Sequence, residues 1–235
     1  MIGIIVSGGI SFLVVIFSTL IGVSFFKSRN IGQEIQEEVD FHDHKKGTPT
    51  MGGLFIVFGT FAGYALSHIN FWTIGKGFKV EITYMNTNVL LIFGIAFLMA
   101  LVGLLDDFLK VKAGRNLGLK PSQKLILQTL VGIISAYYFV YLNYDTSFYF
   151  FSGLGFDIGI LKWLIIIFFI IGITNSVNFT DGLDGLVAGS SAISYGGILI
   201  ISFWIYRHPE YYSKFIGQNF LTVEISLLIS AVAGA

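Results

Sequence analysis

Long apolar runs separated by short polar segments dominate the sequence and predict membrane-spanning helices. A helix needs about 20 mostly apolar residues to cross a bilayer. Six runs meet or approach this length: Ile2–Phe26, Met51–Ser67, Val89–Leu105, Leu125–Leu142, Trp163–Thr174 and Leu186–Tyr206. The fifth run lengthens if the polar residues 175–180 continue the same helix, and a seventh begins near Phe215. The pattern predicts an all-α, polytopic helical bundle with six complete spans and the start of a seventh, in one transmembrane domain over residues 1–235.

The composition agrees with this pattern. Hydrophobic residues make up 54% of the chain and charged residues 12%, whereas a soluble domain carries roughly 25% charged residues. The net charge is zero, which gives no indication of a nucleic-acid partner. The chain has no cysteine, so disulfides, thiolate metal sites and thiol nucleophiles are excluded.

The two ends of the chain carry different expectations. The first charged residue is Lys27, so the N-terminal run lacks the charged start of a signal peptide and is too long for its apolar region. We expect this run to remain as a permanent span. The last run stops at Ala235 without a cap or a charged flank, and we expect the chain to be truncated there or to be a fragment.

The lysines and arginines between the runs predict the orientation, because cytoplasmic loops carry an excess of them. If the spans alternate, nine basic residues fall on one side: Lys27, Arg29, Lys45, Lys46, Lys110, Lys112, Arg115, Lys120 and Lys124. Five fall on the other: Lys76, Lys79, Lys162, Arg207 and Lys214. The first side is therefore predicted to be cytoplasmic, with the N-terminus outside. Three polar clusters share that cytoplasmic side.

The first cluster is the segment HKKGTPTMGG, residues 44–53. Its glycines and its proline break any regular helix. Glycines let backbone N–H groups approach an anion, and lysine and threonine side chains donate to phosphate. A plain alternative is a turn into the second span with lysines as topology anchors.

The second cluster is the segment LLDDFLK, residues 104–110. Asp106 and Asp107 directly follow a long apolar run, where an unpaired charge is costly. Neighbouring residues point about 100° apart on a helix, so the two carboxylates need not share one task. Lys110 lies three positions after Asp107 on the same helical face. The alternative is a solvated helix end with an ion pair.

The third cluster is the segment NSVNFTDGLDG, residues 175–185, in which Asn175, Asn178, Asp181 and Asp184 recur every three residues. Two amides and two carboxylates with no adjacent basic residue favour an oxygen-ligand site for a hard cation such as Mg²⁺. The alternative is a polar turn between two helices. Taken together, the clusters favour phosphoryl chemistry at the membrane surface, in which Mg²⁺ binds phosphates and lysines neutralise charge.

The strings HKKGTPTMGG, LVGLLDDFLK and NSVNFTDGLDGLVAG resemble three signature blocks of the phospho-N-acetylmuramoyl-pentapeptide transferase (MraY) family, in matching order. The resemblance covers essentially all 235 residues. The DD pair and the NxxNxxDGxDG block are shared with the wider superfamily of polyprenyl-phosphate sugar-1-phosphate transferases, whereas the GTPTMGG form is typical of the pentapeptide enzymes. The family's later aspartate block and His-rich loop have no counterpart in this sequence.

The resemblance implies an activity and roles for particular residues. The expected reaction is Mg²⁺-dependent transfer of phospho-MurNAc-pentapeptide from its UDP carrier to undecaprenyl phosphate, giving lipid I and UMP in peptidoglycan synthesis at the bacterial cytoplasmic (inner) membrane. The implied catalytic residues are Asp106 and Asp107, and the implied metal ligands are Asn178 and Asp181. The implied substrate-binding residues are Lys45, Thr50, Lys110, Lys124, Asn178, Asp181, Gly182, Leu183 and Asp184. A homodimer is a further expectation.

Two mechanisms and several rival functions remain open at this point. The lipid phosphate can attack the sugar-bound phosphorus directly, since its second pKa of ~6 leaves it largely ionised at neutral pH. Alternatively, Asp106 or Asp107 forms a covalent aspartyl-phosphate. The rival functions are a sibling transferase that moves GlcNAc-1-phosphate, a non-catalytic fragment, and a cation transporter with carboxylates along an ion path.

Overall fold

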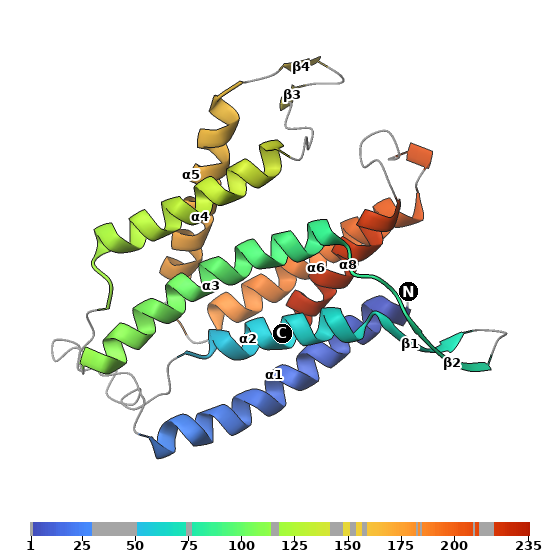
Figure 1. Ribbon diagram of the computed structural model, residues 1–235, viewed down its shortest axis with the longest axis horizontal. Coiled ribbons are helices and arrows are strands. Elements are labelled where there is room, and N and C mark those ends of the chain that lie inside the picture. Colours follow the sequence, from blue (N-terminus) through green and yellow to red (C-terminus); the bar gives the residue numbers. More distant parts are fainter. Residues whose placement is uncertain are drawn as a thin grey trace.

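The computed structural model describes residues 2–29, 51–73, 77–113, 118–141, 148–150, 154–156, 159–181, 183, 185–208, 210–211 and 219–235. Helices make up most of this part of the chain. They are α1 (Ile2–Ser28), α2 (Gly53–Leu66), α3 (Thr87–Ala113), α4 (Pro121–Tyr141), α5 (Leu161–Thr180), α6 (Leu186–Arg207) and α8 (Asn219–Gly234). Helices α1, α2, α3, α4 and α6 run in similar directions in the view of Figure 1, and α5 crosses α4 at a steep angle. The prediction of an all-α membrane bundle is confirmed.

The helix lengths refine the predicted spans. Five helices (α1, α3, α4, α5 and α6) are long and apolar enough to cross a membrane. Helix α2 has 14 residues and is therefore about 21 Å long, so the predicted run Met51–Ser67 was too long. Helix α5 continues through the polar residues 175–180, as the sequence allowed. The last described helix begins at Asn219, and Phe215, near which the seventh run was predicted to begin, lies outside the described residues.

Two β-hairpins occur in segments between the apolar runs, to which the sequence analysis assigned no secondary structure. Strands β1 (Ile69–Thr73) and β2 (Gly77–Ile82) pair antiparallel between α2 and α3, and β3 (Phe148–Phe150) and β4 (Leu154–Phe156) pair between α4 and α5. Their aromatic and β-branched residues favour strands. Both hairpins project beyond the helices (Figure 1), so they add to the bundle without changing its class.

Helices α1, α2 and α8 pack closely through small residues. A Cβ on Gly63 of α2 would lie 2.7 Å from Ser11 Cβ, and one on Gly8 would lie 2.7 Å from Ser230 Oγ. Ser7 Oγ donates to the backbone oxygen of Leu227 at 2.8 Å, and Ser230 Oγ donates to that of Ile4 at 2.6 Å. Close backbone approach and serine hydrogen bonds are the usual means by which membrane helices associate.

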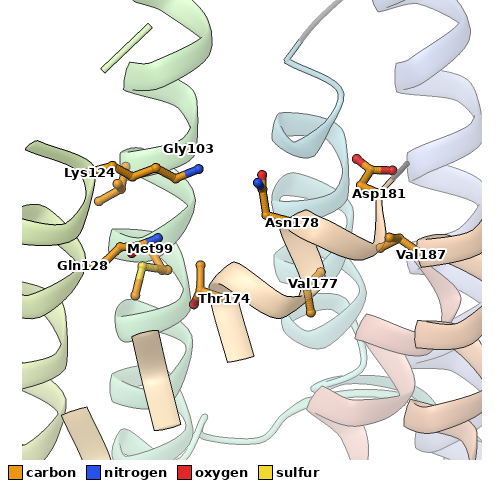
Figure 2. Close-up of a pocket in the computed structure, with 10 residues that line it drawn as sticks. Met99, Gly103, Lys124, Gln128, Thr174, Val177, Asn178, Asp181 and Val187 are labelled. Atoms are coloured by element: carbon orange, nitrogen blue, oxygen red, sulfur yellow. The ribbon is translucent and has the colours of Figure 1, made fainter. Parts of the chain in front are cut away.

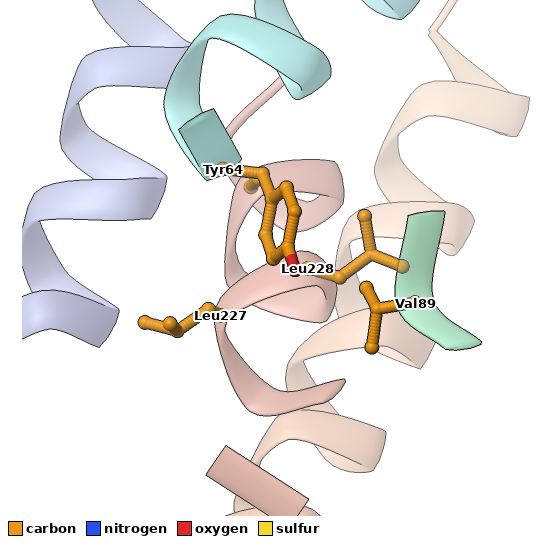
Figure 3. Close-up of a cluster of buried hydrophobic side chains, with 5 residues drawn as sticks. Tyr64, Val89, Leu227 and Leu228 are labelled. Atoms are coloured by element: carbon orange, nitrogen blue, oxygen red, sulfur yellow. The ribbon is translucent and has the colours of Figure 1, made fainter. Parts of the chain in front are cut away.

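The apolar core of the described bundle lies near the end of α2 and the beginning of α3. Tyr64, Val89, Leu227, Leu228 and Ala231 form it. Figure 3 shows the ring of Tyr64 lying between α2 and α8, near Leu228 and Val89. This core fixes the end of the bundle from which the β1–β2 hairpin projects.

Beside this core lies a buried polar group, which we call the closed cluster: Tyr64, His68 and Glu224. Tyr64 Oη donates to Glu224 Oε2 at 2.6 Å, and His68 Nε2 lies 3.0 Å from the same oxygen and 3.1 Å from Glu224 Oε1. The three residues are 0%, 2% and 3% exposed. His68 is also tied to the hairpin side, because its backbone oxygen accepts from Thr83 N at 3.0 Å. The cluster therefore joins α2, α8 and the segment that follows β2.

Candidate functional site

The aspartate pair lies on the last turns of α3, where it forms ion pairs with one lysine. Lys110 Nζ lies 2.6 Å from Asp106 Oδ2 and 3.2 Å from Asp107 Oδ1. The helix carries both carboxylates one turn before Lys110, which is the spacing at which side chains on a helix meet. The predicted neighbourhood of Asp106, Asp107 and Lys110 is therefore present. The ammonium of Lys110 is held by carboxylates within its own helix.

The two aspartates have different surroundings. Asp106 Oδ1 accepts a hydrogen bond from the backbone N–H of Leu119 at 2.8 Å, and the side chain is 13% exposed. Asp107 is 34% exposed, and its Oδ2 has no partner among the residues that the structure describes. Asp106 thus closes the corner between α3 and α4, whereas Asp107 is the more exposed of the two carboxylates.

Gly118 makes this corner possible. A Cβ at this position would lie 2.7 Å from the backbone oxygen of Asp106 and would also collide with its carboxylate. Only glycine lets the chain before α4 pass so close to α3. The corner brings the first turn of α4, with Lys124, next to the end of α3. Asp106 is attracted to Lys124 as well as to Lys110.

A cavity of about 260 Å³ lies between α3, α4, α5 and the start of α6. Its lining combines apolar residues with a few polar ones: Met99, Val102, Gly103, Lys124, Gln128, Thr174, Val177, Asn178, Asp181 and Val187. In Figure 2 the amino group of Lys124 points across the cavity toward Asn178, and Asp181 lies on the far side. A basic side chain thus faces an amide and a carboxylate across a space large enough for part of a ligand. The aspartate pair is one helical turn beyond Val102 and Gly103, outside the lining itself.

The third predicted cluster divides its members between two directions. Asn175 turns toward α4, where its Nδ2 donates to Gln128 Oε1 at 2.8 Å. Asn178 and Asp181 are exposed and line the cavity. Leu183 is 68% exposed and accepts, through its backbone oxygen, a hydrogen bond from Leu186 N at 3.1 Å. The drift of a three-residue repeat around a helix explains this division.

The oxygen donors of Asn178 and Asp181 suit a magnesium ion. Mg²⁺ is usually bound by one or two carboxylates together with substrate phosphates and water. The part of the chain that the structure describes contains no group of three or more His, Cys, Asp or Glu residues that would form a complete metal cage. The amide oxygen of Asn178 and the carboxylate of Asp181 are of the donor types that such a site uses.

Four predicted substrate-binding residues lie outside the described residues: Lys45, Thr50, Gly182 and Asp184. The structure brings together Lys124, Asn178 and Asp181, with the aspartate pair and Lys110 beside them. The sequence analysis missed Gln128 and Thr174, which also line the cavity. A glutamine within an apolar run was the signal that could have found the first of them.

Comparisons with known proteins give consistent results. A profile of glycosyl transferase family 4 matches residues 89–234, and signature 1 of phospho-N-acetylmuramoyl-pentapeptide-transferase matches residues 45–57. The chain is similar to proteins named phospho-N-acetylmuramoyl-pentapeptide-transferase from three bacteria.

The relative from Salinispora arenicola is 34% identical over 99% of this chain and 68% of its own length. The relatives from Corynebacterium efficiens and Oceanobacillus iheyensis are 36% and 37% identical over 87% and 86% of this chain. The matched regions are 59% and 60% of these two relatives, so the chain spans about three fifths of their length.

Proposed function

The chain belongs to the phospho-N-acetylmuramoyl-pentapeptide-transferase family within glycosyl transferase family 4, and on that premise we propose that it transfers phospho-MurNAc-pentapeptide from UDP to undecaprenyl phosphate. The products are lipid I and UMP. The observation that carries the proposal is the cavity in which Lys124 faces Asn178 and Asp181, beside the partly exposed carboxylate of Asp107. A diphosphate between two substrates needs this combination of positive charge and oxygen ligands.

The reaction we propose is a direct displacement at phosphorus. An oxygen of the lipid phosphate attacks the phosphorus that carries the sugar. The bond from that phosphorus to the bridging oxygen breaks, and UMP leaves with the electron pair. The lipid phosphate is largely ionised at neutral pH, because its second pKa is ~6. It therefore needs positioning more than it needs deprotonation.

Asp107 is the better candidate for contact with the substrates. Asp106 has both oxygens engaged, with Lys110 Nζ at 2.6 Å and Leu119 N at 2.8 Å. The contact described for Asp107 is with Lys110 at 3.2 Å through Oδ1, and the side chain is about one-third exposed. We assign Asp106 to holding the α3–α4 corner, and Asp107 to orienting the lipid phosphate or accepting its remaining proton.

Lys124 and the α5 residues complete the proposed division of tasks. The ammonium of Lys124 would attract the diphosphate and offset the charge that develops on UMP. Asn178 and Asp181 would hold Mg²⁺, which, when bound, neutralises the diphosphate oxygens. Lys45, Thr50, Gly182, Leu183 and Asp184 remain proposed substrate contacts.

The chain is a multi-pass membrane protein, and we propose that it lies in the bacterial cytoplasmic membrane with the site at the cytoplasmic face. The excess of lysine and arginine near residues 27–46 and 110–124 supports this orientation and an external N-terminus. A site at the end of α3 suits both a water-soluble nucleotide donor and a lipid acceptor. The homodimer stays a prediction.

The decisive experiment uses the complete gene product, purified in nanodiscs, with labelled UDP-MurNAc-pentapeptide, undecaprenyl phosphate and Mg²⁺. We expect a lipid-soluble labelled product and release of UMP in equal amounts. Labelled UDP-GlcNAc is the matched control donor and should give no product. Transfer from UDP-GlcNAc alone would assign the sibling activity instead, and no transfer from either donor would overturn the proposal.

A second measurement separates the direct and covalent routes. The protein is incubated with donor labelled in the sugar-bound phosphate, without the lipid acceptor, and is then denatured. We expect no label on the protein, because direct displacement needs the acceptor. A labelled aspartyl-phosphate that disappears in Asp107→Asn would establish the covalent route.

A cation transporter is less consistent with the arrangement of the carboxylates. Glu224 lies within the bundle far from the site, which the sequence analysis did not weigh, but it is fully paired with Tyr64 and His68. An ion path needs carboxylates that can exchange partners along it. We therefore expect no proton or cation flux into proteoliposomes that contain the protein and to which no UDP-linked donor has been added.

A further inference from the structure

Helices α4 and α5 are joined by a reciprocal pair of side-chain amides. Asn175 Nδ2 donates to Gln128 Oε1 at 2.8 Å, and Gln128 Nε2 donates to Asn175 Oδ1 at 3.4 Å. Asn175 Nδ2 also donates to the backbone oxygen of Ile171 at 2.8 Å, which fixes the direction of this amide. Gln128 is 1% exposed.

The amide pair lies one helical turn from the groups that face each other across the cavity. Gln128 follows Lys124 by four residues, so both lie on the same face of α4. Asn175 precedes Asn178 by three residues on α5. Figure 2 shows Gln128 one turn below Lys124 at the cavity wall. Any rotation or sliding between α4 and α5 would therefore change how Lys124 meets Asn178.

The other contacts described between the two helices are aromatic or apolar. The rings of Tyr137 on α4 and Trp163 on α5 lie 6.5 Å apart between centroids. One turn after Gln128 on α4, a Cβ on Gly132 would lie 3.3 Å from Ile167 Cγ2 and 3.4 Å from Ile167 Cα. This notch sets how closely the helices approach. Lipid tails are as apolar as the packed side chains, so the apolar contacts leave the rotation of each helix weakly fixed. A pair of amides with defined donors and acceptors fixes it.

We propose that Gln128 is a positioning residue, which acts through Asn175 to set Lys124 opposite Asn178. The inference rests on the proposed function for its kinetic effect. Gln128 has its amide oxygen and nitrogen engaged by Asn175, so it serves the diphosphate site without contacting the diphosphate. A displacement of about 1 Å in such a site can cost about 100-fold in rate.

The first test is kinetic and uses the complete gene product. Gln128→Leu keeps the approximate size of the side chain and removes both hydrogen bonds. We expect kcat to fall about 10-fold to 100-fold, with the KM for UDP-MurNAc-pentapeptide changed less than about threefold. The exchange Gln128→Asn with Asn175→Gln preserves the summed length of the pair and should restore kcat to within about threefold. If Gln128→Leu fails to accumulate, Gln128→Asn alone serves as the shortened variant.

Thr129→Val is the matched control. Thr129 is the next residue of α4, and its hydroxyl donates to the backbone oxygen of Leu125 within the helix at 2.7 Å. Its loss should leave both kinetic constants unchanged. A Gln128→Leu variant that retains kcat within twofold would overturn the positioning role. Restored stability without restored kcat in the exchanged pair would overturn it as well.

The second test measures the helices without any turnover, so that it stands apart from the proposed function. The chain has no cysteine, and any cysteine elsewhere in the complete protein is replaced. Spin labels at Ile133→Cys on α4 and Ile173→Cys on α5 occupy exposed positions. We expect a narrow distance distribution that broadens or shifts in Gln128→Leu and not in Thr129→Val. An unchanged distribution would overturn the inference even if kcat falls. Absence of transfer in the unaltered protein would instead refute the proposed function alone.

Discussion

The closed cluster lies near the beginning of α3, and the group formed by Asp107, Lys124, Asn178 and Asp181, which we call the open site, lies near its end; the two differ in burial and in how their polar atoms are paired. The closed cluster meets the beginning of α3, where Asn86 N lies 3.5 Å from Glu224 Oε2. Asp106 lies 19 residues after Thr87, which is about 29 Å along the helix. The polar side-chain atoms of the closed cluster bond to one another or to the backbone, whereas Asp107, Asn178 and Asp181 at the other end are accessible.

The buried side chains of the closed cluster are paired by hydrogen bonds. His68 Nδ1 lies 2.8 Å from the backbone oxygen of Tyr64, which only accepts, so this nitrogen carries hydrogen. Nε2 faces the Glu224 carboxylate, which also accepts a hydrogen bond from the Tyr64 hydroxyl. The buried side chains of the closed cluster therefore satisfy one another, whereas the exposed carboxylates at the other end of α3 are suited to bind a ligand.

The largest effect that separates the two ends is expected at Glu224. Glu224→Leu leaves Tyr64 Oη and His68 without their shared partner, and we expect the free energy of unfolding to fall by about 3–5 kcal/mol. Unfolding in mixed micelles, followed by tryptophan fluorescence, measures it. Glu224→Leu with His68→Leu should recover part of the loss, because both partners are then apolar. A loss under about 1 kcal/mol in the single variant would show that the cluster does not hold the bundle.

At the other end, the expected effect is on rate instead of stability. Asp107→Asn should lower kcat for lipid I formation by about 10²-fold to 10³-fold, since the carboxylate that meets the lipid phosphate loses its charge. Its stability should change by less than about 0.5 kcal/mol, because the side chain is partly exposed.

Asp106→Asn is the control for this assignment. It removes the acceptor of Lys110 and weakens the bond to Leu119 N, so stability and rate should fall together. If Asp106→Asn changed the rate alone and Asp107→Asn changed both, the roles would be reversed.

The helices could be predicted from the sequence, and their ends could not. A window of apolar residues stopped at Leu105, whereas α3 continues to Ala113. It continues because Asp106 and Asp107 each pair with Lys110 on the next turn, which makes charged residues compatible with the helix. The same reason applies to α5, whose polar end is satisfied in part by Gln128.

The sequence predicted those neighbours in the site that lie within a few residues of one another along the chain. Asp106, Asp107 and Lys110 are neighbours on one helix, and Asn178 and Asp181 share a cavity, as the motifs indicated. The partners of Asn175 and Glu224 are 47 and 156 residues away, and no periodicity within a segment can reveal such pairs. The hairpins were missed because their strands of three to six residues are much shorter than the apolar runs of about 20 residues by which the spans were found.

A smaller effect is expected from the proposed metal ligand in the open site. Asp181→Asn should raise the Mg²⁺ concentration needed for half-maximal rate by at least about 10-fold, which even the loss of a group that supports a ligand can cause. A magnesium titration of lipid I formation measures it. Thr180→Val is the matched control, because the Thr180 hydroxyl donates to Ser176 within α5 at 2.9 Å. Equal magnesium dependence in Asp181→Asn and the unaltered protein would remove Asp181 from the metal site.

The smallest expected effect is a change in the free energy of unfolding when glycines at the start of α6, next to the open site, are replaced by alanine. Gly185 precedes α6 with φ of 79°, in the left-handed region, and a Cβ there would meet nothing within 4 Å. Gly189, one turn into α6, also has open space around it. Gly185→Ala should therefore lower the free energy of unfolding by about 1 kcal/mol through backbone strain, whereas Gly189→Ala should raise it by about 0.5–1 kcal/mol through helix propensity. Unfolding curves of the two variants measure the difference. Because neither alanine meets a described residue, opposite signs would show that the turn after Asp181 is held by the conformation of Gly185. Equal signs would contradict that assignment.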